Sequence, residues 1–190
     1  MHSKKTVGFI VSLLVSFLVL VMYTFLADRA VRAQQVLTLR SDAANALWVA
    51  SADEIIKVTS ADGTVVFTIP SAQDVRAVAV DARRGLLWAY SERGLQAYSF
   101  SGLFVRSVRL SQLDEDDEHS ALAVNADDGT VWLGVHQTLL HLDTLGQLLS
   151  TTHLPENVQA LALDTSTTRL WVSSKKTVSA YNTKIGRAHV

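Results

Sequence analysis

Short apolar runs, separated by turn-forming residues, fill the chain from residue 36 onward. Residues 77–105 show the pattern in full, with four runs: Ala77-Val78-Ala79-Val80, Leu86-Leu87-Trp88-Ala89-Tyr90, Leu95-Gln96-Ala97-Tyr98 and Gly102-Leu103-Phe104-Val105. A polar turn, Ala82-Arg83-Arg84-Gly85, separates the first two. Alternation with a period of two, broken by Gly, Asp and Asn about every ten residues, predicts antiparallel strands and not helices.

The tryptophans show that this pattern repeats. They are separated by 40, 44 and 39 residues, at Trp48, Trp88, Trp132 and Trp171. Asp81, Asn125 and Asp164 each follow an alternating run and each lie seven residues before their Trp. Four short strands in a unit of about 40 residues are typical of a β-propeller blade. The predicted fold class is therefore all-β, a β-propeller of which about three and a half four-stranded blades are present over residues 36–184.

The repeated positions have physical roles in such a fold. Strands near the propeller axis are crowded, so small residues fit there: Ala77, Ala79, Ala121, Ala123, Ala160 and Ala162. We expect each Trp ring to fill the space between neighbouring blades, because a lone blade cannot bury both of its faces. We expect Asp81, Asn125 and Asp164 to be structural, with side chains that hydrogen-bond the backbone of the following turn. Leu37-Thr38-Leu39 is a weaker first copy of the inner run.

A different pattern occupies the N-terminus, where the 22 residues from Thr6 to Ala27 include no Asp, Glu, Lys, Arg or His. A helix of that length spans about 33 Å, enough to cross a membrane. Lys4 and Lys5 precede it, which favours a cytoplasmic location for residues 1–5. We therefore predict a transmembrane signal anchor over residues 6–27, followed by a linker over residues 28–35.

Two alternatives to the anchor stay open. A cleaved signal peptide would use Val31-Arg32-Ala33 as its small-x-small site and leave a mature chain beginning at Gln34. The other alternative is a buried helix of a soluble protein. The anchor and the signal peptide both place the rest of the chain outside the cytoplasm, in the periplasm or at the cell surface.

Composition excludes several classes of function. Seventeen Lys and Arg against eighteen Asp and Glu give a net charge of -1, so no basic field is available and no nucleic-acid partner is expected. The chain has no Cys, which excludes disulfides, Cys-ligated zinc and thiol nucleophiles. No Gly-x-Ser-x-Gly motif and no phosphate-binding Gly loop occurs. We predict no catalytic and no cofactor-binding residue.

Two groups of residues are candidates for ion binding. The acidic run Asp114-Glu115-Asp116-Asp117-Glu118, with His119 behind it, accounts for the longer spacing of 44 residues. It would suit calcium or a cationic partner, but it lacks the alternate spacing of a calcium loop, and a solvated loop is the preferred interpretation. His136, His141 and His153 fall within one blade without a spacing that makes them converge, so we predict no metal site.

The motif Ala-Val-Ala-Val-Asp-x4-Leu-Leu-Trp, with an apolar-x-Ala-Tyr run and a Gly turn behind it, resembles the NHL/YVTN class of β-propeller repeats from Val36 to Lys184. This resemblance implies a ring of six or seven blades, so we expect a truncated chain. Residues 185–190, Ile-Gly-Arg-Ala-His-Val, resemble the translation of a sequencing adapter. The N-terminal segment followed by blades is also similar to the front end of large bacterial RHS/YD-repeat surface proteins.

These observations together predict a membrane-anchored extracytoplasmic propeller that serves as a binding or scaffold module for a protein, peptide or glycan. The expected context is the N-terminal part of a larger envelope or surface protein. The alternative is an extracytoplasmic propeller enzyme of the lactonase or lyase type, with its site in the missing blades. The Ala, Val and Leu residues of the inner runs favour the scaffold.

Overall fold

The structure is a computed structural model, and it describes residues 39–41, 46–50, 54–59, 62–69, 75–110 and 120–183. The predicted anchor from Thr6 to Ala27, the linker, the acidic run at Asp114 to Glu118 and residues 184–190 lie outside these ranges. Within them, no helix has the length and hydropathy needed to span a membrane.

Fifteen strands in these ranges form four antiparallel sheets, in each of which the strands follow chain order. The first sheet consists of β1 (Leu39–Ser41), β2 (Ala46–Ala50), β3 (Ile55–Thr59) and β4 (Val65–Ile69). The second consists of β5 (Ala77–Asp81), β6 (Leu86–Ser91), β7 (Gly94–Ser99) and β8 (Phe104–Val108). The third consists of β9 (Ser120–Val124), β10 (Val131–Val135), β11 (Thr138–Leu142) and β12 (Leu148–His153). The fourth has three described strands: β13 (Ala160–Asp164), β14 (Arg169–Ser173) and β15 (Val178–Asn182).

The predicted strands agree with the observed ones where the structure describes them. Leu37 and Thr38 of the first predicted inner run lie outside the described residues, and Leu39 belongs to β1. β1 pairs with β2, with Leu39 opposite Val49 and Ser41 opposite Leu47. The all-β architecture of four-stranded antiparallel sheets is confirmed, and three strands of the fourth sheet lie in the described ranges.

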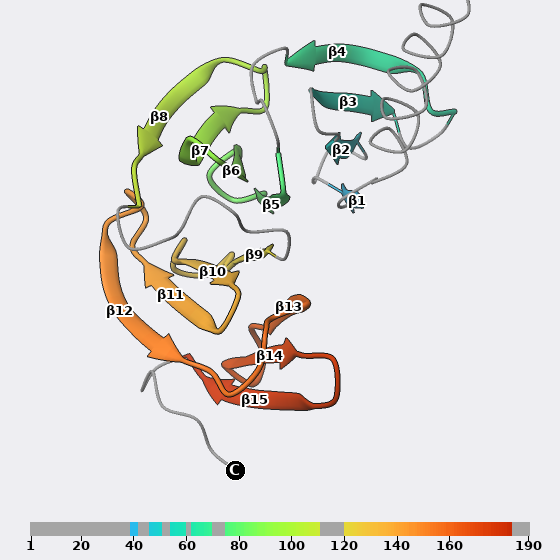
Figure 1. Cartoon of the computed structure of the whole chain (residues 1–190). Coiled ribbons are helices and arrows are strands. Elements are labelled where there is room, and N and C mark those ends of the chain that lie inside the picture. Colours follow the sequence, from blue (N-terminus) through green and yellow to red (C-terminus); the bar gives the residue numbers. More distant parts are fainter. Residues whose placement is uncertain are drawn as a thin grey trace, which may run out of the picture. The chain divides into compact units, whose positions relative to one another are not determined.

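Neighbouring sheets pack face to face (Figure 1). Their first strands lie side by side, β5 against β9 and β9 against β13. Three clusters of buried residues each join two successive sheets, and each contains the Trp of the earlier sheet: Trp48, Trp88 and Trp132. The core of this part of the chain is therefore divided among the spaces between sheets, which is the packing of propeller blades.

Candidate binding surfaces

The inner strands β5 and β9 present small buried side chains: Ala77, Ala79, Ala121 and Ala123 are each at most 8% exposed. Two buried polar side chains lie at the ends of these strands: Asp81 is the last residue of β5, and Asn125 directly follows β9. In the described ranges no group of three or more His, Cys, Asp or Glu side chains is placed to hold a metal.

Asp81, Asn125 and Asp164 each accept hydrogen bonds within their own turn. Asp81 accepts one from the backbone N–H of Arg84 at 3.1 Å, and Asn125 Oδ1 accepts one from the backbone N–H of Asp127 at 3.0 Å. Asp164 accepts bonds from the backbone N–H of Ser166 at 3.1 Å and from its hydroxyl at 2.6 Å. Side-chain hydrogen bonds lower the pKa of Asp164 to about 2. This geometry is that of Asx turns.

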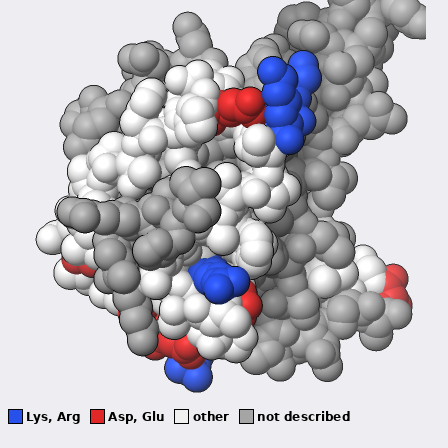
Figure 2. Space-filling model, turned by 90° about the horizontal axis from the view of Figure 1, so that it is seen from below, with Lys and Arg blue, Asp and Glu red and all other residues white. Residues whose placement is uncertain are grey.

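A contact missed by the sequence analysis joins two of these turns. Arg84 is paired with Asp81 at 3.3 Å, and its guanidinium also lies over Gly129 in the third sheet's turn, where a Cβ would stand 2.4 Å from Cζ. Arg83 pairs with Asp127 at 3.1 Å. The sequence did hold a signal for this contact. One copy of the turn carries the basic pair Arg83-Arg84, and the next copy carries the acidic pair Asp127-Asp128. Figure 2 shows charged groups of both signs scattered over a described surface that is mostly uncharged.

The three histidines of the third sheet lie in different settings. His141 stacks on Trp132 with ring centroids 3.9 Å apart and an angle of 8° between the planes. Burial lowers the pKa of His141, and the charge of Asp128 opposes this effect in part. His136 lies in the β10–β11 turn, and His153 ends β12. His141 thus serves as a packing partner of the Trp.

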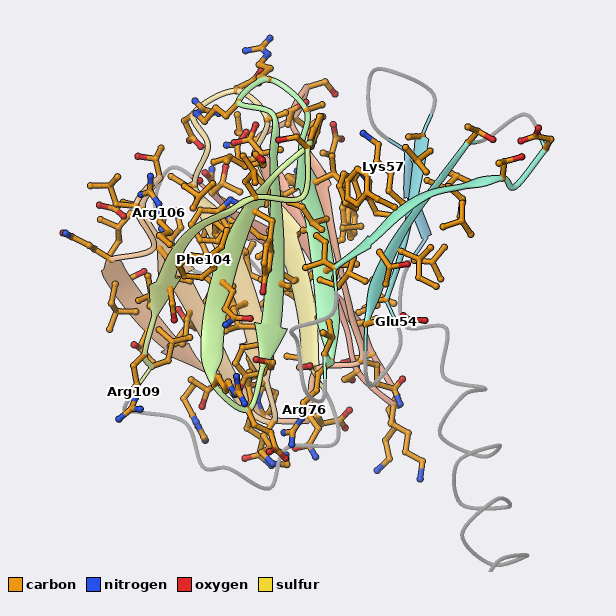
Figure 3. The ribbon with its side chains drawn as sticks, turned by 90° about the horizontal axis from the view of Figure 1, so that it is seen from above. Glu54, Lys57, Arg76, Phe104, Arg106 and Arg109 are labelled. Carbon is orange, nitrogen blue, oxygen red and sulfur yellow. The ribbon has the colours of Figure 1, made fainter. Side chains whose placement is uncertain are left out.

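Lys57 occupies the position in the first sheet that His141 occupies in the third, directly opposite the Trp of its sheet. Its Nζ lies 5.0 Å from the ring centroid of Trp48, 5.8 Å from that of Phe67 and 5.4 Å from that of Phe100, and it donates a hydrogen bond to the Phe100 carbonyl at 3.1 Å (Figure 3). These are cation–π distances. The second sheet has Ala97 here and the fourth has Ala180, so the side chain opposite the Trp differs among the sheets.

The outer strands β4, β8 and β12, with the turns before β8 and β12, expose large apolar side chains in three successive sheets. We call this set the outer row, and its members are between 39% and 69% exposed: Val65, Val66, Leu103, Phe104, Val105, Leu145, Leu148 and Leu149. Phe104, labelled in Figure 3, makes an edge contact with Tyr98 while 58% of its surface stays exposed. The sequence signal was two consecutive apolar residues shortly after each Gly turn, because neighbours in a strand point to opposite faces.

A second apolar surface belongs to the fourth sheet. Trp48, Trp88 and Trp132 are at most 1% exposed, whereas Trp171 is 39% exposed. The residues around it on the same face are also open or half-buried, and we call the set the fourth-sheet face: Ala160, Ala162, Trp171, Val178 and Ala180. No further described sheet lies beyond it.

Comparisons with known proteins define the fold. No family model and no curated protein matches the chain. Solved structures that are similar to it include hydrazine synthase from Kuenenia stuttgartiensis, with a TM-score of 0.68 and 9% identity over 81% of this chain and 47% of that chain. The WD40 repeats of RRP9 match with a TM-score of 0.63 and 16% identity over 77% of this chain and 47% of that one. Sqt1 from Saccharomyces cerevisiae matches with a TM-score of 0.61 and 18% identity over 76% and 44%.

The described part of the chain thus has a β-propeller fold. At these identities the likeness extends to the fold alone, and the resemblance to NHL/YVTN and RHS proteins stays a prediction. The chain spans less than half the length of the structures it matches.

Proposed function

We propose that this protein is a membrane-anchored extracytoplasmic β-propeller that acts as a binding or scaffold module. The outer row carries the proposal, because it is a set of solvent-exposed apolar side chains that recurs in three sheets. Its chemistry favours an apolar protein or peptide segment over a glycan, since the row offers few hydrogen-bonding groups. The small apolar inner strands support the same conclusion against an enzyme.

A peptide selection tests the binding role. Random peptides displayed on phage are selected on the full chain held in lipid nanodiscs, and the selected peptides are measured against variants. Phe104→Asp is expected to weaken binding by about tenfold or more, as for a truncated hot-spot residue. Ser107→Asp, on the same strand and also exposed, is the matched control and should bind as the parent does. Selected peptides that bind both variants equally would remove the outer row from the function.

The anchor is proposed from the 22 residues between Thr6 and Ala27, and its orientation from Lys4 and Lys5. A reporter fused after Lys184 tests this part. Alkaline phosphatase, which is active only outside the cytoplasm, should be active in the fusion, and a reporter that works only in the cytoplasm should be silent. The reverse pattern would contradict the extracytoplasmic location, and release of the chain from the membrane would favour the cleaved signal peptide.

We further propose that the repeats are of the NHL/YVTN type and that the chain is the front part of a larger envelope protein, possessing RHS/YD repeats downstream. The repeated Ala-Val-Ala-Val-Asp and Trp positions support the first, and coverage of less than half of each matched structure supports the second. Sequencing through the native 3′ end of the gene tests both. Additional blades followed by a stop codon would replace the surface-protein proposal with a free-standing propeller.

An extracytoplasmic propeller enzyme is the second candidate, because one matched structure is named as hydrazine synthase. A lactonase or lyase would need acidic or His side chains on inner strands. In β5, β9 and β13 the residues between the strand ends are Ala, Val and Leu, and the acidic residues Asp81 and Asp164 at two of the ends hydrogen-bond within their own turns. Further blades with Asp, Glu or His at these positions would favour the enzyme.

A further inference from the structure

The third sheet has two edges, and they lie in different settings. Its strands follow the order β12-β11-β10-β9, so β9 and β12 are its edge strands. β9 lies beside the inner strands β5 and β13. β12 lies at the far end of the order (Figure 1), and no described strand pairs with its outer side. Because successive sheets pack through their faces, an additional sheet in the array would leave the edge of β12 open.

The register of β12 identifies the backbone groups that point out of the sheet. Directly after β12, the N–H of Leu154 donates a hydrogen bond to the carbonyl of Gln137 at 2.7 Å. Hydrogen-bonded and non-hydrogen-bonded pairs alternate along an antiparallel ladder. Counted back from Leu154 along an unbroken register, His153 and Thr151 fall in non-hydrogen-bonded pairs. Their N–H and C=O groups therefore point to the open edge.

The edge of β12 lacks two features that keep exposed strands from pairing. β12 has the sequence Leu-Leu-Ser-Thr-Thr-His, without Lys, Arg, Asp, Glu or Pro. By contrast, β8 includes Arg106, and Pro70 directly follows β4. Charged side chains and proline blunt natural sheet edges, and an exposed edge without them is a template for another strand. Thr151 and Thr152 also favour extended backbone, since both are β-branched.

A β-bulge brings apolar side chains to the start of the same edge. The register of β11 and β12 shifts so that Leu149 is the extra residue, and residues 150–153 pair regularly after it. Leu148 is 39% exposed and Leu149 is 55% exposed, and both belong to the outer row. β12 therefore offers apolar contacts at its first two residues and unpaired main-chain groups at its last residues.

From these observations we infer that the partner of the outer row is an extended peptide segment that adds a strand to the edge of β12, an inference that rests on the proposed function. The segment exchanges main-chain hydrogen bonds with Thr151 and His153, and its apolar side chains contact Leu148 and Leu149. Strand addition of this kind takes its affinity from main-chain bonds and its specificity from side chains. The turn before β12 packs against β8, so one segment can also contact the outer strand of the second sheet.

N-methylated peptides test the main-chain bonds. Peptides are selected by phage display on the full chain in lipid nanodiscs, and each backbone N–H of one selected peptide is replaced in turn by N–CH₃. The replacement removes a donor and leaves the side chains unchanged. Binding should weaken by about tenfold or more at two positions that are two residues apart, and it should change little at the position between them. Loss of this alternation would overturn the inference, whereas weaker binding to Phe104→Asp would still support the proposed function.

A variant of the chain tests the location of the added strand. Thr151→Pro removes an outward N–H, and edge strands accept proline where the N–H faces solvent. This change should weaken peptide binding by about tenfold or more. Ser107→Pro is the matched control and should bind as the parent does, because Ser107 is the second residue after the bulge of β8, as Thr151 is in β12.

Circular dichroism verifies that both proline variants are folded, and the N-methyl scan needs no variant. Unchanged binding to folded Thr151→Pro, or equal losses in the two proline variants, would overturn the inference. A selection that yields no peptide would contradict the proposed function and the added strand together.

Discussion

The second and fourth sheets carry the same Ala–Trp–Ala row across three strands in two different environments: Ala79, Trp88 and Ala97 in the second, and Ala162, Trp171 and Ala180 in the fourth. Trp88 is fully buried by the third sheet, and Trp171 is 39% exposed on the outermost described face. The comparison shows that the repeat encodes a face that is suited to contact, while burial of that face depends on the neighbouring sheet. Stability in such an array is the sum of contacts between neighbours. Equivalent residues in the two sheets should therefore contribute unequally.

The largest expected effect separates the two tryptophans directly. Trp88→Ala removes a buried aromatic ring and should lower the free energy of unfolding by about 3–5 kcal/mol, and Trp132→Ala should behave alike. Trp171→Ala should lower it by less, by about 1–3 kcal/mol, because 39% of this side chain is already in solvent. Urea denaturation of the full chain measures both. Equal losses would contradict the assignment of Trp88 to the space between sheets.

Two turn glycines allow the same comparison between a packed position and an open one, with a smaller expected effect on stability. Gly146 has φ +83°, and a Cβ there would lie 2.7 Å from Val108 Cγ2 of the preceding sheet. Gly63 has φ +73°, with no described atom within 4 Å of such a Cβ. Both Gly→Ala changes carry the backbone penalty, but Gly146→Ala should cost about 1–3 kcal/mol more, since it also overpacks the contact. Similar melting temperatures for the two variants would argue against close packing of the turn on β8.

A substitution in the turn that follows the inner strand of the fourth sheet should stabilise the protein. Gly85 and Gly129 hold the last position of the equivalent turns at φ +64° and +79°, whereas the fourth sheet has Thr168 there at φ +55°. A β-branched residue is strained in this region. Thr168→Gly should raise the free energy of unfolding by about 0.5–1 kcal/mol, after the greater freedom of Gly in the unfolded chain is subtracted. Gly85→Thr is the reverse control, and stabilisation by that change would contradict the account.

The smallest expected effect concerns pH. Because burial lowers the pKa of His141 below its ordinary 6.5, the unfolded chain takes up this proton at a higher pH than the folded chain. The contribution of His141 to stability is therefore complete above pH 6.5 and falls as the pH drops toward the folded-state pKa. His141→Ala, which reproduces Ala97 of the second sheet, should remove this component. Thermal melts of both proteins between pH 8 and pH 5 would show the difference, and parallel curves would contradict it.

Much of the fold was predictable because its signals are local. The inner run Ala77 to Val80 became β5, and the Gly turns at Gly102 and Gly146 precede β8 and β12 as the alternation indicated. The place of Trp48, Trp88 and Trp132 between sheets followed from the repeat, but the individual polar contacts that join sheets were not predictable, since they depend on residues about 40 positions apart. Lys57 among aromatic rings, and Arg84 over Gly129, are the clearest cases.

The candidate surfaces were only partly predictable. The outer row contains consecutive apolar residues such as Phe104 and Val105. Once the strand is known, such a pair predicts exposure, because neighbouring side chains point to opposite faces of the sheet and only one face can pack against a given neighbour. The exposure of Trp171 has no local signal at all. Its surroundings in the sequence match those of Trp88, and the difference comes entirely from which sheet lies next to it.

The most direct test of stacked sheets is a disulfide between them in this cysteine-free chain. A Cβ at position 146 would lie 3.5 Å from the Cβ of Val108, and disulfides need about 3.5–4.5 Å. Mild oxidation of folded Val108→Cys/Gly146→Cys is therefore predicted to form an intramolecular disulfide, seen by mass spectrometry as the loss of two hydrogens. Val108→Cys/Gly63→Cys should stay reduced under the same conditions. Failure of the first pair to join in a folded chain, or equal oxidation of both pairs, would contradict the stacking of β12's turn on β8.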